Sequence, residues 1–211
     1  MKKYSSPRGS AGPQGQRAGT TKAPGRSALN DNSGEAAPSG RTGVAATGSK
    51  TVYISLGSNV GDRAATLARA VEALTAAGIR VMRQSSLYVT EATDGPPQSW
   101  FLNAVAEAET SLMPLQLLRA VQQIERDFGR RRITPRGPRT LDLDILLYGS
   151  SVIHKRELEV PHLRLPARRF VLAPLAELAP ALRPPTLHRT IAQLLADTED
   201  RSQVRLWRPN S

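Results

Sequence analysis

The nine residues Gly137-Pro-Arg-Thr-Leu-Asp-Leu-Asp-Ile145 say most about both the fold and the chemistry of the chain. From Thr140 onward, polar and apolar residues alternate with a period of two, which predicts a β-strand. Successive side chains of a strand point to opposite faces. Asp142 and Asp144 therefore share one face of the predicted strand, and its leucines and Ile145 share the other.

Two carboxylates side by side repel each other unless a cation lies between them. A hard divalent ion with oxygen ligands fits this need, and Mg²⁺ is usual where phosphates complete its ligand shell. Arg139, just upstream, suits a phosphate oxygen. The strand is therefore predicted to carry a magnesium and phosphate site.

The segment that leads into this strand is strongly cationic. Residues 130–139 contain five arginines together with proline and glycine, and they show no helical pattern. We expect a loop that is mobile without a ligand. A solvated charge run is the plainer interpretation, but arginines next to paired aspartates favour a combined triphosphate and metal site.

The remaining pattern predicts strands alternating with amphipathic helices. Asp62 is expected to cap the first helix, Pro114 to begin the second and Gly129 to end it. Gln122 and Glu125 lie beside the apolar stripe of the second helix and are interpreted as a solvated face. The expected strands are 51–56, 79–89, 102–107, 142–148 and a hairpin within 152–160, and the expected helices are 62–78, 114–128, 172–178 and 191–195.

Three further features bear on a binding site. Gly57 follows the first strand and suits either a phosphate cradle or a tight turn. Trp100 and Phe101 are adjacent and cannot both face inward from a strand, so one of them is expected to line a surface or a pocket. His162 lies in a proline-flanked loop with arginines downstream, where a structural role and a phosphate contact are both open.

The bulk composition limits the classes of function. The chain has 211 residues, no cysteine and a net charge of +11. There is thus no disulfide framework or thiolate metal site, and no apolar run is long enough to span a membrane. The charge indicates a polyanionic partner, which could be nucleic acid, an anionic membrane or a nucleotide.

Residues 1–50 differ from the rest of the chain. They are rich in Gly, Ser, Pro and Ala, and they hold about half of the net charge, with eight Lys/Arg against two acidic residues. Such a segment buries too little apolar surface to fold, so we expect a disordered basic tail followed by one domain over 51–211. A transit peptide is the alternative, but the segment lacks an amphipathic face. The expected location is the cytoplasm.

Four motifs in order resemble one enzyme family. They are Tyr53-Ile-Ser-Leu-Gly-Ser-Asn59, Phe101-Leu-Asn103, the Gly137–Ile145 string, and Val160-Pro-His162 with Arg168 and Phe170. Together they are similar to the 6-hydroxymethyl-7,8-dihydropterin pyrophosphokinases of folate biosynthesis. The resemblance runs from about Val52 to Leu195. It implies an α+β fold, a ferredoxin-like α/β sandwich in which helices pack on an antiparallel sheet.

The resemblance also implies a reaction and a set of roles. The pyrophosphoryl group of ATP would move to the hydroxymethyl oxygen of the pterin and leave AMP, in a chain expected to act as a monomer. Asp142 and Asp144 would hold two Mg²⁺ ions and, with Arg130 and Arg139, would be catalytic. The ATP contacts would come from Gln122, Arg130, Arg132, Arg139, Ile145, His162 and Arg168. The pterin contacts would come from Thr90, Phe101, Asn103 and Phe170.

The chain departs from the family at Arg136 and Leu163, where aromatic residues are usual; Arg136 could stack on the pterin instead. Two rival functions remain open at this point. A ferredoxin-like sheet with a basic surface could bind RNA, although paired aspartates repel phosphate without a metal. A different metal-dependent nucleotide transferase could share the Asp-x-Asp pattern alone.

Overall fold

The computed structural model describes residues 48–92, 97–129 and 137–209. The expectations for the tail over 1–50, for most of the arginine loop and for Arg136 therefore concern residues that lie almost wholly outside the described part. No helix in these ranges is long and apolar enough to cross a membrane.

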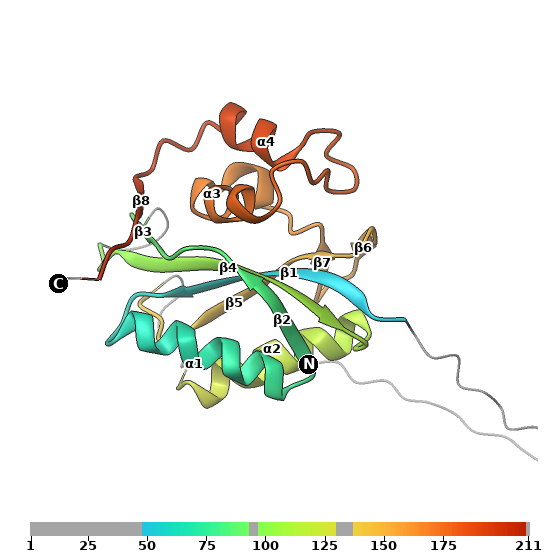
Figure 1. Cartoon of the computed structure of the whole chain (residues 1–211), viewed down its shortest axis with the longest axis horizontal. Helices are drawn as coiled ribbons and strands as arrows, with labels where there is room; N and C mark the ends of the chain where they lie inside the picture. The colour runs from blue at the N-terminus through green and yellow to red at the C-terminus, as the bar shows by residue number, and fades with distance from the viewer. Residues whose placement is uncertain (1–47, 93–96, 130–136, 210–211) are drawn as a thin grey trace, which may run out of the picture. The chain divides into compact units, whose positions relative to one another are not determined.

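An antiparallel sheet forms the centre of the described part, with two helices on each face (Figure 1). Its core strands are β1 (Lys50–Ser58), β2 (Ile79–Gln84), β4 (Phe101–Thr110) and β5 (Asp142–Tyr148). Helix α1 (Arg63–Ala76) follows β1 and helix α2 (Pro114–Asp127) follows β4. The order β5-β1-β4, with β2 also paired to β4, makes the βαββαβ arrangement of a ferredoxin-like fold. The predicted fold class is confirmed.

The alternation of side chains on β1 separates the core into two layers. Val52, Ile54 and Leu56 point to α1 and α2 and are fully buried. Tyr53 points to the other face, where it packs with α3 (Arg169–Leu178) and α4 (Ile191–Asp197). Each face of the sheet thus has its own apolar core.

The helix signals predicted from the sequence are present. The Asp62 carboxylate accepts a hydrogen bond from the Ala65 N–H at 3.0 Å and caps α1. Pro114 begins α2, and Gly129 follows it with a φ of +77°, a conformation that glycine adopts at low cost. The Gln116 side chain caps the N–H of Met113 at the other end of α2.

The predicted strand over 79–89 is wrong as a single element. The chain leaves regular pairing at Ser85 and continues as β3 (Tyr88–Thr90), so β2 and β3 pair with different halves of β4. Ser85 fills the gap, because its N–H binds the Val105 carbonyl and its hydroxyl accepts the Val105 N–H. The predicted hairpin is confirmed as β6 (Ile153–His154) and β7 (Glu159–Val160).

Two elements were not predicted from the sequence. A 3₁₀ turn, η1 (Leu165–Ala167), leads into α3. Strand β8 (Val204–Leu206) pairs with β3 and extends the sheet. β8 has only three residues, so its pattern alone does not distinguish it from a loop.

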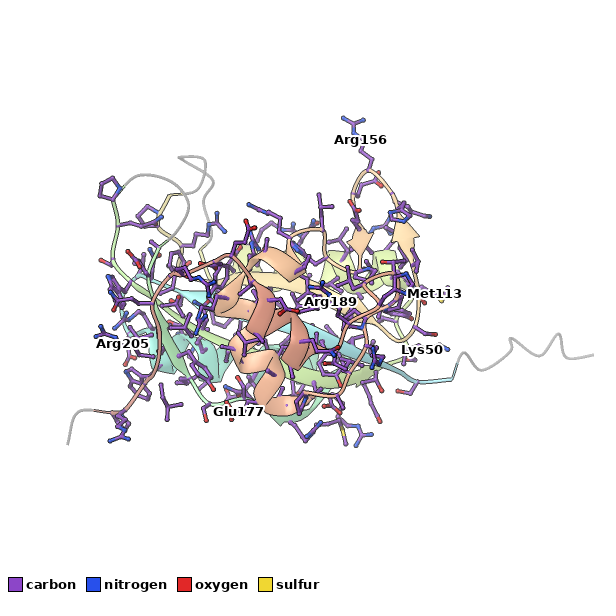
Figure 2. All side chains as sticks on the ribbon, turned by 90° about the horizontal axis from the view of Figure 1, so that it is seen from above. Lys50, Met113, Arg156, Glu177, Arg189 and Arg205 are labelled. Atoms are coloured by element: carbon purple, nitrogen blue, oxygen red, sulfur yellow. The ribbon has the colours of Figure 1, made fainter. Side chains whose placement is uncertain are left out.

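One polar contact joins α3 to β3. The Glu177 carboxylate accepts hydrogen bonds from the N–H and the hydroxyl of Ser86, both at 2.9 Å, and from the Tyr88 hydroxyl at 2.8 Å. Figure 2 looks down on the α3 and α4 layer and shows Glu177 near the edge of the molecule. Burial alone would raise the pKa of Glu177, but these hydrogen bonds outweigh it and lower the pKa. Burial and the Glu177 contact raise the pKa of Tyr88 to about 12.

These two shifts predict the pH range of the contact. Its stabilising effect is fully present above the usual pKa of Glu177 and is lost as the pH falls through the lowered value. The effect is also lost at the alkaline end, as the pH rises from the usual pKa of tyrosine, about 10, through the raised value of Tyr88. We expect Glu177→Gln to flatten the acid side of a plot of thermal midpoint against pH, and Tyr88→Phe to flatten the alkaline side. Plots parallel to that of the wild type would contradict the assignment.

Candidate active site

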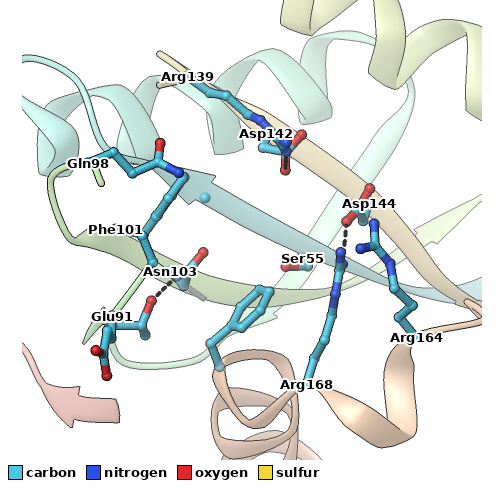
Figure 3. Close-up of a pocket in the computed structure, with 14 residues that line it drawn as sticks. Ser55, Glu91, Gln98, Phe101, Asn103, Arg139, Asp142, Asp144, Arg164 and Arg168 are labelled. Carbon is cyan, nitrogen blue, oxygen red and sulfur yellow. Dashed lines mark hydrogen bonds and ion pairs between the residues drawn. The ribbon is translucent and has the colours of Figure 1, made fainter. Parts of the chain in front are cut away.

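A single pocket on the α3 side of the sheet collects most of the predicted site residues. Its floor is formed by β1, β4 and β5, and its wall by the segment from η1 to the first turn of α3 (Figure 3). Eight predicted residues line it, namely Thr90, Phe101, Asn103, Arg139, Asp142, Asp144, Arg168 and Phe170.

The acidic and basic end of this pocket lies on β5. Asp142 and Asp144 share the pocket face of the strand, and Leu143 and Ile145 point into the core beneath it. The predicted two-sided strand is thus confirmed. Arg139 forms an ion pair with Asp142 at 2.5 Å, and Arg168 forms one with Asp144 at 3.2 Å. The arginines offset the repulsion between the two carboxylates.

His162 borders the same end. Its Nε2 lies 3.9 Å from an Asp144 oxygen, and its Nδ1 accepts the Arg164 N–H at 3.2 Å. The proton of the neutral ring is therefore on Nε2, toward Asp144. Burial lowers the pKa of His162, and the nearby Arg168 and Arg164 lower it further against the opposing effect of Asp144. The lowered pKa favours the neutral ring, and His162 itself does not line the pocket.

The opposite end of the pocket is polar and aromatic. Phe101 and Phe170 both line it, so Phe101 is the pocket-facing member of the Trp100–Phe101 pair. Trp100 instead lies under the Arg205 guanidinium, with 5.7 Å between that group and the centre of the ring. Asn103 is only 4% exposed, and its Nδ2 donates to the Thr90 hydroxyl at 2.6 Å. This bond fixes the amide so that its carbonyl oxygen lies over Gly57.

Gly57 lies within β1, so neither the phosphate cradle nor the tight turn considered from the sequence is correct. It pairs with Asn103 on one side and Asp142 on the other. A Cβ at this position would lie 2.6 Å from the Asn103 carbonyl oxygen. The glycine is thus explained by the space that the buried amide needs, which no local turn signal could reveal.

Asn59 has a linking role that the sequence did not predict. It is 5% exposed and lies just after β1. Its Oδ1 accepts the Arg139 N–H at 2.7 Å, and its Nδ2 donates to Gln98 Oε1 and the Ser99 carbonyl at 3.0 and 3.2 Å. One side chain therefore joins the segment that carries Arg139 to the segment that leads into Phe101.

Other predicted residues lie elsewhere. Gln122 is half-buried on α2 and does not line the pocket, and the side chain of Ile145 is in the core. Arg130 and Arg132 lie outside the described residues. Arg164 and Ser55 do line the pocket, although neither was predicted. Arg164 was visible only as one more cation near Phe170, and Ser55 only as a small residue within a strand.

The residues present fit a magnesium ion that shares its shell with phosphate. The described part contains no group of three or more Asp, Glu, His or Cys side chains that could enclose a metal. It does place two carboxylates on one face of one strand, with no thiolate nearby. One or two carboxylates with substrate phosphates are the usual ligands of Mg²⁺.

A pocket with these two ends suits an enzyme that brings a polyphosphate next to a flat, polar acceptor. The chain belongs to the 7,8-dihydro-6-hydroxymethylpterin-pyrophosphokinase (HPPK) family, whose sequence model matches residues 53–180. The resemblance inferred from the motifs is confirmed.

Known relatives agree with this assignment. The chain is 43% identical over 160 residues to the 2-amino-4-hydroxy-6-hydroxymethyldihydropteridine pyrophosphokinase of Bacillus subtilis, which covers 75% of this chain and 91% of that protein. It is 44% identical over 146 residues to the enzyme of the same name in Pseudomonas aeruginosa, covering 69% and 90%.

Larger relatives match over a part of their length. The chain is 42% identical over 162 residues to the folic acid synthesis protein fol1 of Schizosaccharomyces pombe, which covers 76% of this chain and 22% of fol1. A crystal structure of Plasmodium falciparum HPPK-DHPS with pterin and p-hydroxybenzoate has a TM-score of 0.56 at 15% identity, covering 70% of this chain and 43% of that one. This structural likeness supports the fold.

The close approach at Gly57 gives a prediction. Gly57→Ala would push its methyl group against the Asn103 carbonyl oxygen, which the Thr90 bond prevents from moving freely. Overpacking of this kind costs about 1–3 kcal/mol of the free energy of unfolding, and we expect binding at the aromatic end to weaken about tenfold. Urea unfolding and pterin titration measure the two effects.

The double variant Gly57→Ala/Asn103→Ala serves as the control. Removing the amide also removes the clash, so the cost of the glycine substitution should nearly vanish in this background. An unchanged cost would contradict the steric explanation.

Proposed function

We propose that the chain transfers the pyrophosphoryl group of ATP to the hydroxymethyl oxygen of 6-hydroxymethyl-7,8-dihydropterin, a step of folate biosynthesis. The observation that carries the proposal is the family match over residues 53–180, within which the Asp142 and Asp144 strand meets the Phe101 and Asn103 strand in one pocket.

In this reaction the hydroxymethyl oxygen attacks the β-phosphorus of ATP. The new bond joins that oxygen to the β-phosphorus, and the bond from the β-phosphorus to the α–β bridging oxygen breaks. AMP leaves with the electron pair, the alcohol loses its proton, and the pterin gains a diphosphate. Transfers of this type depend on positioning and on charge neutralisation more than on covalent help from the protein.

The acceptor half would hold the pterin between Phe101 and Phe170. Two ring faces at the two sides of a slot suit a flat heterocycle. The Asn103 carbonyl oxygen, fixed through the Thr90 hydroxyl, is a hydrogen-bond acceptor for an N–H on the edge of the pterin. Together these four residues would orient the hydroxymethyl group toward β5.

The donor half would hold the triphosphate next to β5. Two Mg²⁺ ions bound to Asp142 and Asp144 would neutralise phosphate charge when present. Arg139 and Arg168 already lie at these carboxylates, and a guanidinium can bind a phosphate oxygen as well as it binds a carboxylate. The Nε2–H of His162 would add a hydrogen bond at the same end.

The other predicted ATP contacts extend this half. Arg130 and Arg132 would bring two more cations to the phosphates. Gln122 on α2 and Ile145 on β5 are the remaining predicted contacts, and Ile145 would contribute through its backbone because its side chain is in the core. Arg164 lines the pocket and is a further candidate for a phosphate contact. Figure 3 shows its guanidinium beside Asp144.

Several broader features belong to the same proposal. We expect a monomer and a cytoplasmic location without a specific nucleic-acid partner. A relative from Pisum sativum is named as mitochondrial, so fractionation of cells that express the full chain is the direct check on location. Size-exclusion chromatography with light scattering tests the monomer.

Substituting either aspartate tests the donor half. Asp142→Ala or Asp144→Ala should reduce AMP formation from ATP and the pterin at least 10³-fold, because the carboxylates that would hold the metal are lost. Pterin binding in the absence of ATP should change less than threefold, since Phe101, Asn103 and Phe170 remain. Chromatography of the nucleotides and fluorescence titration of the pterin provide the two readouts.

The product distinguishes this reaction from others. AMP that appears only when the pterin is present supports pyrophosphoryl transfer. ADP as the product, or AMP formed without the pterin, would indicate a different nucleotide transferase. Near-normal activity in either aspartate variant would contradict the metal assignment.

A further inference from the structure

No sequence pattern indicates a role for Glu125, and the solvated face expected for it is wrong. The residue is 5% exposed on α2. Its Oε1 accepts the backbone N–H of Leu143 at 2.8 Å. A carboxylate is rarely buried to this degree, because transfer out of water is costly unless hydrogen bonds replace the lost hydration.

The position of Leu143 in the sheet explains what this bond does. β5 lies at the edge of the sheet, and within the described part of the chain its strand neighbour is β1 alone. Along an antiparallel strand, backbone groups point alternately toward the neighbour and away from it. Since the Leu143 N–H binds a residue of α2, it points away from β1, and Glu125 takes the place of a missing neighbour strand.

The same edge is held at a second point. The His162 N–H donates to the Leu146 carbonyl at 2.9 Å, close to where the pairing of β1 with β5 shifts register. The two contacts lie three residues apart along β5. Between them they fix the outer edge of the stretch that carries Asp144.

Leu143 is the residue between Asp142 and Asp144. The peptide groups on its two sides set the direction of both carboxylates, so a rotation of the strand at Leu143 would move them together. An edge strand has hydrogen bonds to one side and resists such rotation less than a central strand. A bond from α2 to the Leu143 N–H is the contact best placed to prevent it.

We propose that Glu125 is a positioning residue that holds Asp142 and Asp144 in the direction needed to bind magnesium with the phosphates of ATP. The first step of this inference, that the Glu125 carboxylate fixes the Leu143 peptide, is independent of the proposed function. The consequence for magnesium binding rests on the proposed function. Glu125 acts from the α2 side of the sheet, whereas the substrates lie on the α3 side.

The alternative is that Glu125 only stabilises the fold. Three variants separate the two roles. Glu125→Leu removes the acceptor, Glu125→Gln keeps an oxygen that can accept the Leu143 N–H, and Val121→Ala removes buried apolar contact one turn earlier on α2. The last variant weakens the packing of α2 without touching a polar contact to β5.

The first measurement is hydrogen exchange of the Leu143 amide in the unliganded protein, by NMR. Glu125→Leu should raise this exchange rate about tenfold above that of Val121→Ala, whereas Glu125→Gln should stay near the wild type. The second is the magnesium concentration that gives half-maximal AMP formation, measured well below the thermal midpoint of every variant. Glu125→Leu should raise it about tenfold, which is within the usual effect of removing a residue that supports a metal ligand.

The outcomes are distinguishable. If Glu125→Leu matches Val121→Ala in both measurements, Glu125 only stabilises the fold and the inference is wrong. If Glu125→Gln behaves like Glu125→Leu, the hydrogen bond to Leu143 is not what positions the strand, and the inference also fails. Hydrogen exchange needs no turnover, so it still reports on Glu125 if the chain forms no AMP, a result that would overturn the proposed function alone.

Discussion

Two carboxylates on one face of an edge strand repel each other, and the rest of the site depends on how this repulsion is offset. The opposing charges come from two places in the chain. Arg139 is three residues before Asp142 and pairs with it, whereas Arg168 reaches Asp144 from the start of α3. The charge balance on β5 therefore depends on the second helical layer, because Asp144 would lose its ion pair with Arg168 if α3 were absent.

The same strand pairing also makes room for a substrate. Asp142 is opposite Gly57 and Asp144 is opposite Ser55, so the central strand has small side chains where the pocket forms. The large residues of β1 on this face begin at Tyr53, under α3 and α4. A cavity beside paired charges thus follows from the small size of two residues on β1, and Gly57 is constrained by the Asn103 amide of the neighbouring strand β4.

Much of this could be predicted where a local pattern carries the information. The alternation in Gly137–Ile145 correctly placed both aspartates on one face, and the Asp62, Pro114 and Gly129 signals located the helix ends. Proximity between distant segments could not be derived from periodicity. Only the family resemblance indicated that Phe101 and Phe170 lie in the same site as the two aspartates of β5. β8 was missed because its three residues gain their strand character from β3 and not from their own pattern.

Asn59 and Glu125 were missed for a shared physical reason. Each is a polar residue that binds backbone groups of another segment, namely those of Arg139 and Ser99 for Asn59 and that of Leu143 for Glu125. Every residue except proline has a backbone N–H, so its sequence does not reveal that a side chain elsewhere binds it. Glu125 directly follows the buried Ile124 on α2, and its sequence context is that of a solvated glutamate. Its burial is explained by the edge of β5, where it binds the Leu143 N–H. An edge strand that must hold two charges toward a substrate needs its outer N–H groups satisfied from one side. A helix packed beneath that edge can do this only with a long acceptor at the margin of its apolar stripe, which is the position that Glu125 occupies.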